Sequence, residues 1–131
     1  MVKVTGVNQS VGKSGSNVYV PDRGDIVWLY FDPQAGHEQA GNRPALVISP
    51  MIYNEVSGLA IVCPITNSTK DYPFEVPVPN GINTTGFVLA DHIKSVDWKA
   101  RKAELKEKVS VEFVTEVISI LSSIIPYPQT D

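Results

Sequence analysis

The stretch GDIVWLYFDPQAGHEQAGNRPALVIS, residues 24–49, contains two apolar runs with a polar loop between them. The runs DIVWLYF (25–31) and PALVIS (44–49) are short and rich in β-branched or aromatic residues, without polar alternation. This pattern predicts two strands that are buried on both faces. The loop carries a histidine, a glutamate, a glutamine, an asparagine and an arginine. So many polar side chains between two buried strands predict a functional role for the loop.

The sequence on the C-terminal side of this stretch continues mainly as strands. LAIVCPIT (59–66) has the same apolar character, with Pro64 marking a bulge or a strand end. PFEVPVP (73–79) alternates with a period of two, and its prolines predict a strand at a sheet edge. GFVLADHIKSVDW (86–98) follows a turn signal and keeps the β character. These segments predict five or more short strands, mostly antiparallel.

Two segments are expected to be helical. PMIYNEVSG (50–58) is long enough for one or two helical turns, ended by Gly58. Near the C-terminus, Ser110 is expected to cap the amphipathic segment SVEFVTEVISILSSII (110–125), which Pro126 stops. The predicted fold class is therefore α+β and mostly β, with a sheet or small barrel and a C-terminal amphipathic helix.

The length of 131 residues, 43% of them hydrophobic, suits one compact domain. We expect this domain to span residues 21–126, after a poorly ordered extension (1–20) and before a short tail (127–131). The single Cys63 allows no intrachain disulfide, and no targeting or membrane segment is visible, so a cytoplasmic protein is expected. One cysteine and two histidines make no zinc ligand set, so no metal or cofactor is expected.

The charges are unevenly distributed along the chain. The net charge is −3, which argues against a generally basic nucleic-acid binder. Residues 94–108, however, hold six basic and three acidic side chains. This segment either contacts phosphates or forms a solvated charged surface. Trp98, beside Lys99 and Arg101, is a candidate for stacking on bases, whereas Trp28 lies in an apolar run and is expected in the core.

Glu38 and Arg43 are the chemically distinctive pair of the polar loop. Five positions apart in an extended chain, they are separated by roughly 17 Å, so a bend is needed to bring them together. Gly36 and Gly41 tolerate the backbone angles of such a bend. A guanidinium fork beside a carboxylate suits phosphoryl chemistry, because the fork holds phosphate oxygens and the carboxylate accepts a proton. The alternative is an ion pair that only orders the loop.

Three stretches resemble the MazF/PemK (Kid) family of toxins from toxin–antitoxin pairs, and the MazF branch most. They are RGDIVWLYFDPQAGHEQAGNRPALVISPMIYN (23–54), VCPITNSTKDYPFEV (62–76) and GFVLADHIKSVDWKAR (86–101). Together with the terminal helix they follow the order and spacing of the family over about residues 20–125. The resemblance implies a strongly twisted antiparallel sheet or small SH3-like barrel with short helices, a fold shared with CcdB toxins.

The resemblance also implies an activity and its partners. Family members are ribosome-independent endoribonucleases that cut single-stranded RNA, chiefly mRNA, at short sequences without a metal. The 2′-hydroxyl attacks the adjacent phosphate and leaves a 2′,3′-cyclic phosphate and a 5′-hydroxyl. The working form is a homodimer, and a MazE-like antitoxin with an acidic flexible tail blocks the RNA groove. The recognition sequence and the identity of the antitoxin stay open.

The family motifs, taken together with the basic segment around Trp98, give an expected catalytic set and an expected RNA-binding set. The catalytic residues are expected to be Glu38, Arg43 and Thr66. RNA contacts are expected from His37, Gln39, Asn67, Lys70, Asp91, Lys94, Trp98 and Arg101.

Some of these roles have open alternatives. Arg43 stays protonated, which favours stabilisation of the phosphorane over proton donation. Thr66 either contacts the phosphate or bonds a strand-end amide. The general base is Glu38 or His37, and we expect Glu38. In the Kid branch an arginine two residues before the aspartate takes part in catalysis, but here Leu89 stands at that position, so a Kid-type role for Asp91 is not expected.

Two other functions compete with the ribonuclease. One is a toxin of the same fold that binds a protein such as gyrase, as CcdB toxins do through a C-terminal Trp-Gly-Ile sequence. The present chain ends in SIIPYPQTD, which does not fit that pattern. The other is a catalytically inactive RNA- or antitoxin-binding homologue, which the presence of both Glu38 and Arg43 argues against.

Overall fold

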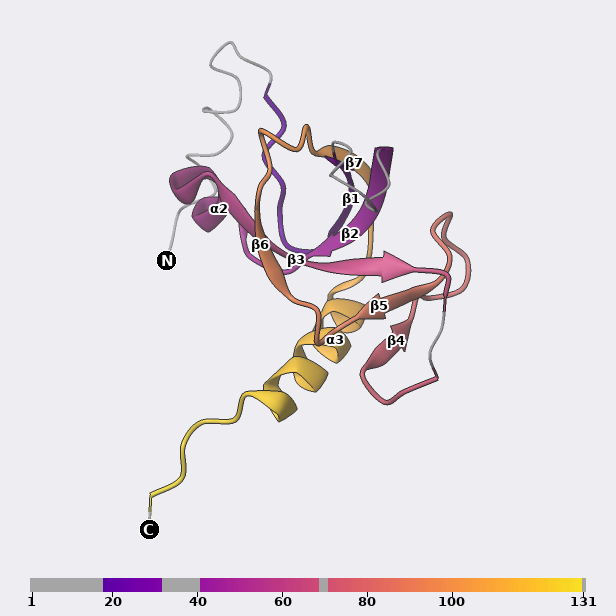
Figure 1. Cartoon of the computed structure of the whole chain (residues 1–131), viewed down its shortest axis with the longest axis vertical. Helices are drawn as coiled ribbons and strands as arrows, with labels where there is room; N and C mark the ends of the chain where they lie inside the picture. The colour runs from indigo at the N-terminus through magenta and orange to yellow at the C-terminus, as the bar shows by residue number, and fades with distance from the viewer. Residues whose placement is uncertain (1–17, 32–40, 69–70, 131) are drawn as a thin grey trace, which may run out of the picture.

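The computed structural model describes residues 18–31, 41–68 and 71–130. These residues form seven strands and two helices, all of which except β7 agree with the predicted segments (Figure 1). In chain order these are β1 Asp25–Phe31, β2 Gly41–Val47, α2 Met51–Ser57, β3 Leu59–Thr66, β4 Glu75–Pro77, β5 Phe87–Leu89, β6 Lys94–Asp97, β7 Glu104–Lys108 and α3 Val111–Ile124.

The described strands form one antiparallel sheet in the order β4-β5-β3-β2-β1-β7, with β6 also paired to β3. The sheet is strongly curved (Figure 1). Among the described strands, β6 pairs only with β3 and β7 only with β1, so the twisted open sheet is confirmed and these strands form no closed barrel. The proline-containing β4 lies at a sheet edge, as predicted. Pro64 lies within β3, between the residues that pair with β6 and those that pair with β5.

Two hydrophobic clusters lie on opposite faces of the sheet, because side chains alternate along each strand. The first cluster includes Ile26, Leu46 and Cys63 and is covered by Phe113 and Val117 of α3. The second includes the intervening residues of the same strands, among them Val27, Ala45 and Val62, together with Trp98. Strands buried on both faces therefore form the centre of the domain, as the two apolar runs predicted.

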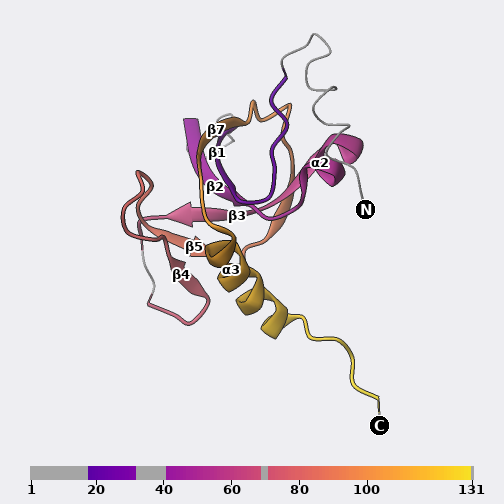
Figure 2. The same cartoon turned by 180° about the vertical axis from the view of Figure 1, so that it is seen from behind.

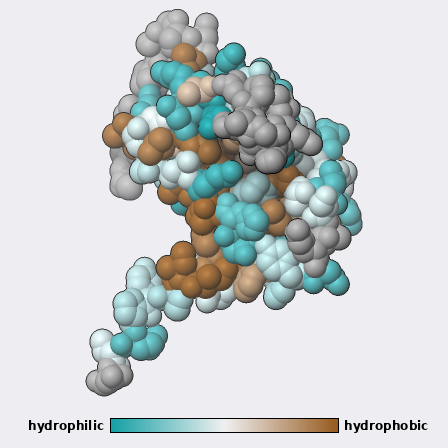
Figure 3. Space-filling view, in the orientation of Figure 1, coloured by the Kyte–Doolittle hydropathy of each residue, from teal (hydrophilic) through white to brown (hydrophobic). Residues whose placement is uncertain are grey.

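Helix α3 crosses one face of the sheet and extends beyond it (Figure 2). Ser110 caps it, as predicted, because the Ser110 hydroxyl accepts a hydrogen bond of 3.1 Å from the Phe113 amide. Only part of the apolar surface of the helix is covered: Val111 is 76% exposed and Ile125, just after the helix, is 66% exposed. Figure 3 shows this hydrophobic surface as brown atoms over α3.

Strand β7 was not predicted, since its sequence ELKEK was interpreted as part of a charged segment. It is held to β1 by backbone pairing and by an ion pair of 2.7 Å between Lys108 and the buried Asp25. Asp25 also accepts a hydrogen bond from the Tyr19 hydroxyl. Tyr19 and Val20 pack against the second cluster, and residues 1–17 lie outside the described residues. No described helix is long and apolar enough to cross a membrane.

Candidate RNA-binding and catalytic site

The face of the sheet that carries the second cluster ends in a small cavity of about 190 Å³. Its lining comes from four strands: Phe31, Arg43, Pro44, Ala45, Val62, Pro64 and Lys94. Phe31, the last residue of β1, is paired with Gly41, the first residue of β2. Arg43 is exposed at the rim of this cavity.

Two further cations gather at the Phe31 ring. The Lys94 ammonium lies 5.7 Å and the Arg101 guanidinium carbon 4.7 Å from the ring centroid. Lys94 reaches this place because β6 pairs with β3, where it lies opposite Val62. Arg101 lies in the turn between β6 and β7, and its carbonyl accepts a hydrogen bond of 2.8 Å from the Tyr30 amide. We call Arg43, Lys94 and Arg101 the Phe31 cation cluster.

This cluster gives a local positive potential to a chain whose net charge is −3. Its three members come from separate parts of the sequence, and all were predicted to contact RNA or its phosphate. The aromatic ring holds two of the cations by cation–π attraction and leaves their N–H groups for anions. Phe31 itself was not predicted, because its place in an apolar strand indicated only burial.

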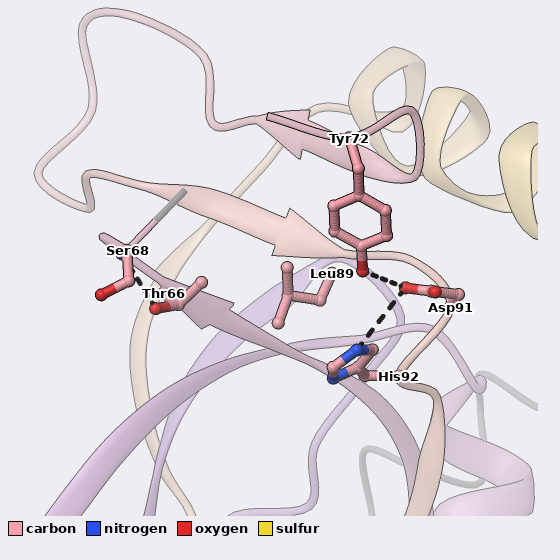
Figure 4. Close-up of a pocket in the computed structure, with 6 residues that line it drawn as sticks. All are labelled: Thr66, Ser68, Tyr72, Leu89, Asp91 and His92. Carbon is pink, nitrogen blue, oxygen red and sulfur yellow. Dashed lines mark hydrogen bonds and ion pairs between the residues drawn. The ribbon is translucent and has the colours of Figure 1, made fainter. Parts of the chain in front are cut away.

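A larger cavity of about 680 Å³ lies farther along the same face. Val62, Pro64 and Thr66 alternate along β3 and therefore point to one face, which connects the two cavities. Thr66, Ser68, Tyr72, Leu89, Asp91 and His92 line the larger one (Figure 4). Leu89 lies between the Thr66–Ser68 side and the Tyr72–Asp91 side.

Several polar groups in or beside this cavity are hydrogen-bonded. The Thr66 hydroxyl accepts a bond of 3.0 Å from the Ser68 amide, which is the structural role weighed against phosphate binding. A hydroxyl that accepts one bond still has a hydrogen to donate, so Thr66 remains a candidate donor to a phosphate oxygen. The side-chain oxygen of Asn67 accepts a bond of 3.0 Å from the Thr85 hydroxyl.

Asp91 is tied to the segment that precedes β4. The Tyr72 hydroxyl donates a hydrogen bond of 2.7 Å to it, and the His92 ring nitrogen lies 3.8 Å away. This hydrogen bond raises the pKa of Tyr72 to about 12. The position that would carry the arginine of a Kid-type mechanism is occupied by Leu89, which lines the cavity beside Asp91. Tyr72 was not singled out by sequence reasoning, although it lies two residues from the predicted Lys70.

The two tryptophans differ from the predictions in how far their side chains are buried. Trp98 is only 5% exposed, belongs to the second cluster and donates a hydrogen bond of 2.9 Å from its indole N–H to the Asn54 carbonyl. This burial contradicts the prediction that Trp98 stacks on bases, since its ring is packed inside the protein. Trp28 is half-buried, with the Lys106 ammonium 5.4 Å from its ring centroid. Cys63 is fully buried, as predicted, and burial raises its thiol pKa to about 12.

Four predicted site residues, His37, Glu38, Gln39 and Lys70, lie outside the described residues. Within the described ranges, no three His, Cys, Asp or Glu side chains are grouped so as to hold a metal ion.

Residues 22–125 match the family of PemK-like, MazF-like toxins of type II toxin–antitoxin systems. The chain is 50% identical over 94 residues to the endoribonuclease toxin MazF of Escherichia coli K12, covering 72% of this chain and 84% of that protein. It is 39% identical over 108 residues to the endoribonuclease PemK of Escherichia coli, covering 79% and 81%. In the crystal structure of MazE–MazF (form II) from Deinococcus radiodurans, a chain with 50% identity superposes with a TM-score of 0.79, covering 85% of this chain and 100% of that one.

Proposed function

The chain belongs to the PemK-like, MazF-like family of toxins from type II toxin–antitoxin systems and is an endoribonuclease toxin, and we propose that it cuts single-stranded RNA at the face carrying the Phe31 cation cluster. The observation that supports this placement is that Lys94 and Arg101 converge on the Phe31 ring, at a cavity whose rim carries Arg43. The neighbouring alternate residues of β3 lead from there to Thr66. Such a surface binds a polyanion, although the whole chain is acidic.

The proposed reaction is a transesterification within the RNA. The 2′-hydroxyl oxygen forms a bond to the adjacent phosphorus, the bond from phosphorus to the 5′-oxygen breaks, and a 2′,3′-cyclic phosphate and a 5′-hydroxyl result. Glu38 accepts the proton of the 2′-hydroxyl, and water returns a proton to the 5′-oxygen. Arg43 donates two parallel hydrogen bonds to the phosphorane oxygens, and Thr66 donates a third. The step needs no metal, since the guanidinium supplies the positive charge.

Two partners follow from the same surfaces. A second copy of the chain is expected to cover the exposed apolar residues of α3 and its C-terminal end, of which Ile125 is 66% exposed. An antitoxin with an acidic tail is expected to occupy the cation cluster in place of RNA, as a polyanion competing for the same charges. Because the substrate is messenger RNA, the proposed place of action is the cytoplasm.

A cleavage assay tests the proposed function. Purified protein is incubated with a long RNA in EDTA, and the product ends are mapped. We expect cuts at a few repeated short sites in single-stranded regions, with cyclic phosphate on the upstream product. Cleavage that requires a divalent metal, or products with 5′-phosphates, would contradict the mechanism. Intact RNA together with tight binding to gyrase would favour the protein-binding alternative.

A further inference from the structure

Glu107 of β7 holds the loop between β4 and β5 by three hydrogen bonds. One carboxylate oxygen accepts a bond of 3.1 Å from the Asn83 amide. The other accepts bonds from the Thr84 amide at 2.7 Å and the Thr84 hydroxyl at 2.5 Å. Glu107 lies on an edge strand, yet its side chain is only 16% exposed. Carboxylates are seldom buried to this extent without hydrogen-bond or ion-pair partners. The hydrogen bonds to this loop are the partners that allow Glu107 to be buried.

Lys106 completes the attachment from the neighbouring position. Its ammonium donates a hydrogen bond of 2.8 Å to the Thr84 hydroxyl and lies 3.6 Å from the Glu107 carboxylate. Thr84 is only 5% exposed. The Thr84 hydroxyl bond lowers the pKa of Glu107, so the carboxylate is ionised at neutral pH. The Thr84 hydroxyl therefore donates one hydrogen bond to Glu107 and accepts one from Lys106, and these two bonds fix the loop at this residue.

The next residues of the same loop lie against the end of β3. The Thr85 hydroxyl donates a hydrogen bond of 3.0 Å to the Asn67 side-chain oxygen. At Gly86 an added Cβ would meet the Thr66 carbonyl at 2.4 Å and the Asn67 side-chain oxygen at 3.0 Å, so the two backbones are in close contact. The residue pair Thr66–Asn67 belongs to the predicted catalytic and RNA-binding sets. Consecutive loop residues thus connect Glu107 with the candidate site.

We propose that Glu107 is a positioning residue for RNA binding, which acts through Thr84 and Thr85 on the Asn67 side chain. This inference rests on the proposed function. The carboxylate is needed because every group it faces is a hydrogen-bond donor. In Glu107→Gln one of the two carboxylate oxygens becomes an NH₂ group, which accepts no hydrogen bond. Either the bond from the Asn83 amide or the two bonds from Thr84 are then lost. The loop is held less firmly, and Thr85 no longer fixes the orientation of the Asn67 amide.

Steady-state kinetics with a short RNA substrate test the route. For Glu107→Gln we expect KM to rise about fivefold, the effect of about one misplaced hydrogen bond, with kcat changed less than twofold. Glu104→Gln removes the same charge from the same strand at an exposed position and should leave both constants unchanged. Asn67→Ala should raise KM to a similar extent. Adding Glu107→Gln to Asn67→Ala should then change KM less than twofold, because the two changes remove one interaction.

Amide hydrogen exchange separates this inference from the proposed function. In Glu107→Gln, exchange should accelerate at residues 83–86 and at Ser68, and in Glu104→Gln it should not. Equal KM values for Glu107→Gln and Glu104→Gln would overturn the inference, as would a full fivefold effect that persists in the Asn67→Ala background. Unchanged exchange at residues 83–86 would overturn it as well. A wild-type protein that leaves RNA intact would refute the proposed function, and the exchange data would still show whether Glu107 holds the loop.

Discussion

Replacing Arg101 by glutamine should weaken RNA binding and reduce its dependence on salt. Arg101 is one of three cations of the Phe31 cation cluster, with its guanidinium 4.7 Å from the ring centroid. Each phosphate contact to single-stranded nucleic acid adds about 0.7 to the negative slope of log K against log salt, so three contacts predict a slope of about −2. Raising NaCl from about 50 to about 200 mM then weakens binding roughly 20-fold for the wild type and roughly sevenfold for Arg101→Gln.

Fluorescence anisotropy with a labelled, fully 2′-O-methylated RNA measures this slope. The methyl groups block the attacking oxygen, so binding is observed without cleavage. At a fixed, low salt concentration the variant should also bind about tenfold more weakly, which corresponds to about 1.4 kcal/mol. Lys94→Gln should act in the same direction, because Lys94 lies over the same ring.

Arg23→Gln is the matched control, with the same change of charge at the opposite end of β1. Arg23 lies before the strand and Phe31 is its last residue, so about eight residues at about 3.3 Å each separate them by roughly 26 Å. That distance exceeds the screening length of about 10 Å at 0.1 M salt. A slope unchanged in Arg101→Gln, or reduced equally in Arg23→Gln, would show that the cluster does not contact phosphates.

Three further predictions concern other parts of the molecule. Glu38→Gln should lower the initial cleavage rate in EDTA by about a hundredfold or more, the typical contribution of a positioned base, while His37→Ala should lower it less than tenfold; the reverse order would make His37 the base. Trp98→Phe should lower the free energy of unfolding in urea by about 1–2 kcal/mol, since the indole bond to Asn54 is lost in a buried place, and RNA affinity should stay within twofold, whereas a large loss of affinity would restore a stacking role. Cys63 should not react with a thiol reagent at about pH 8 in the native protein, because burial raises its pKa to about 12, but should react in guanidinium; rapid native labelling would contradict its burial.

The apolar strands of the centre could be predicted from sequence because both of their faces are buried. In the second half of β2, from Ala45 to Val47, and in most of β3 the side chains pack against one cluster or the other, so composition alone identified these runs. β7 could not be found this way, since its alternating charges carry no apolar period. It is a strand because β1 offers an unpaired edge and Asp25 attracts Lys108. Whether such a segment forms a strand depends on contacts with residues that are distant in the sequence, and the local sequence does not reveal these contacts.

The candidate site, like the fold, could be predicted from the sequence only in part. The motif residues Arg43 and Thr66 and the basic residues Lys94 and Arg101 were predicted. That Arg43, Lys94 and Arg101 gather near Phe31 depends on how the strands pair. Trp98 was wrongly placed at the surface because its neighbours in the sequence are basic. Residues that are close in the sequence can point to opposite sides of a turn. Here the Trp98 ring points inward, while Arg101 lies over the Phe31 ring.

The pairing of β1 with β7 joins the two ends of the domain, and it sets the order in which the site forms during protein synthesis. Ribosomes add about 5–20 residues per second, so the 70 residues from Phe31 to Arg101 take roughly 4–14 s to make. Throughout that interval β7 has not been made, so β1 lacks this neighbour. The Phe31 ring lacks at least the Arg101 guanidinium. A chain released early, anywhere before Arg101, therefore has an incomplete phosphate-binding cluster. On the proposed function, the RNA-binding site is therefore complete only after most of the message that encodes it has been translated.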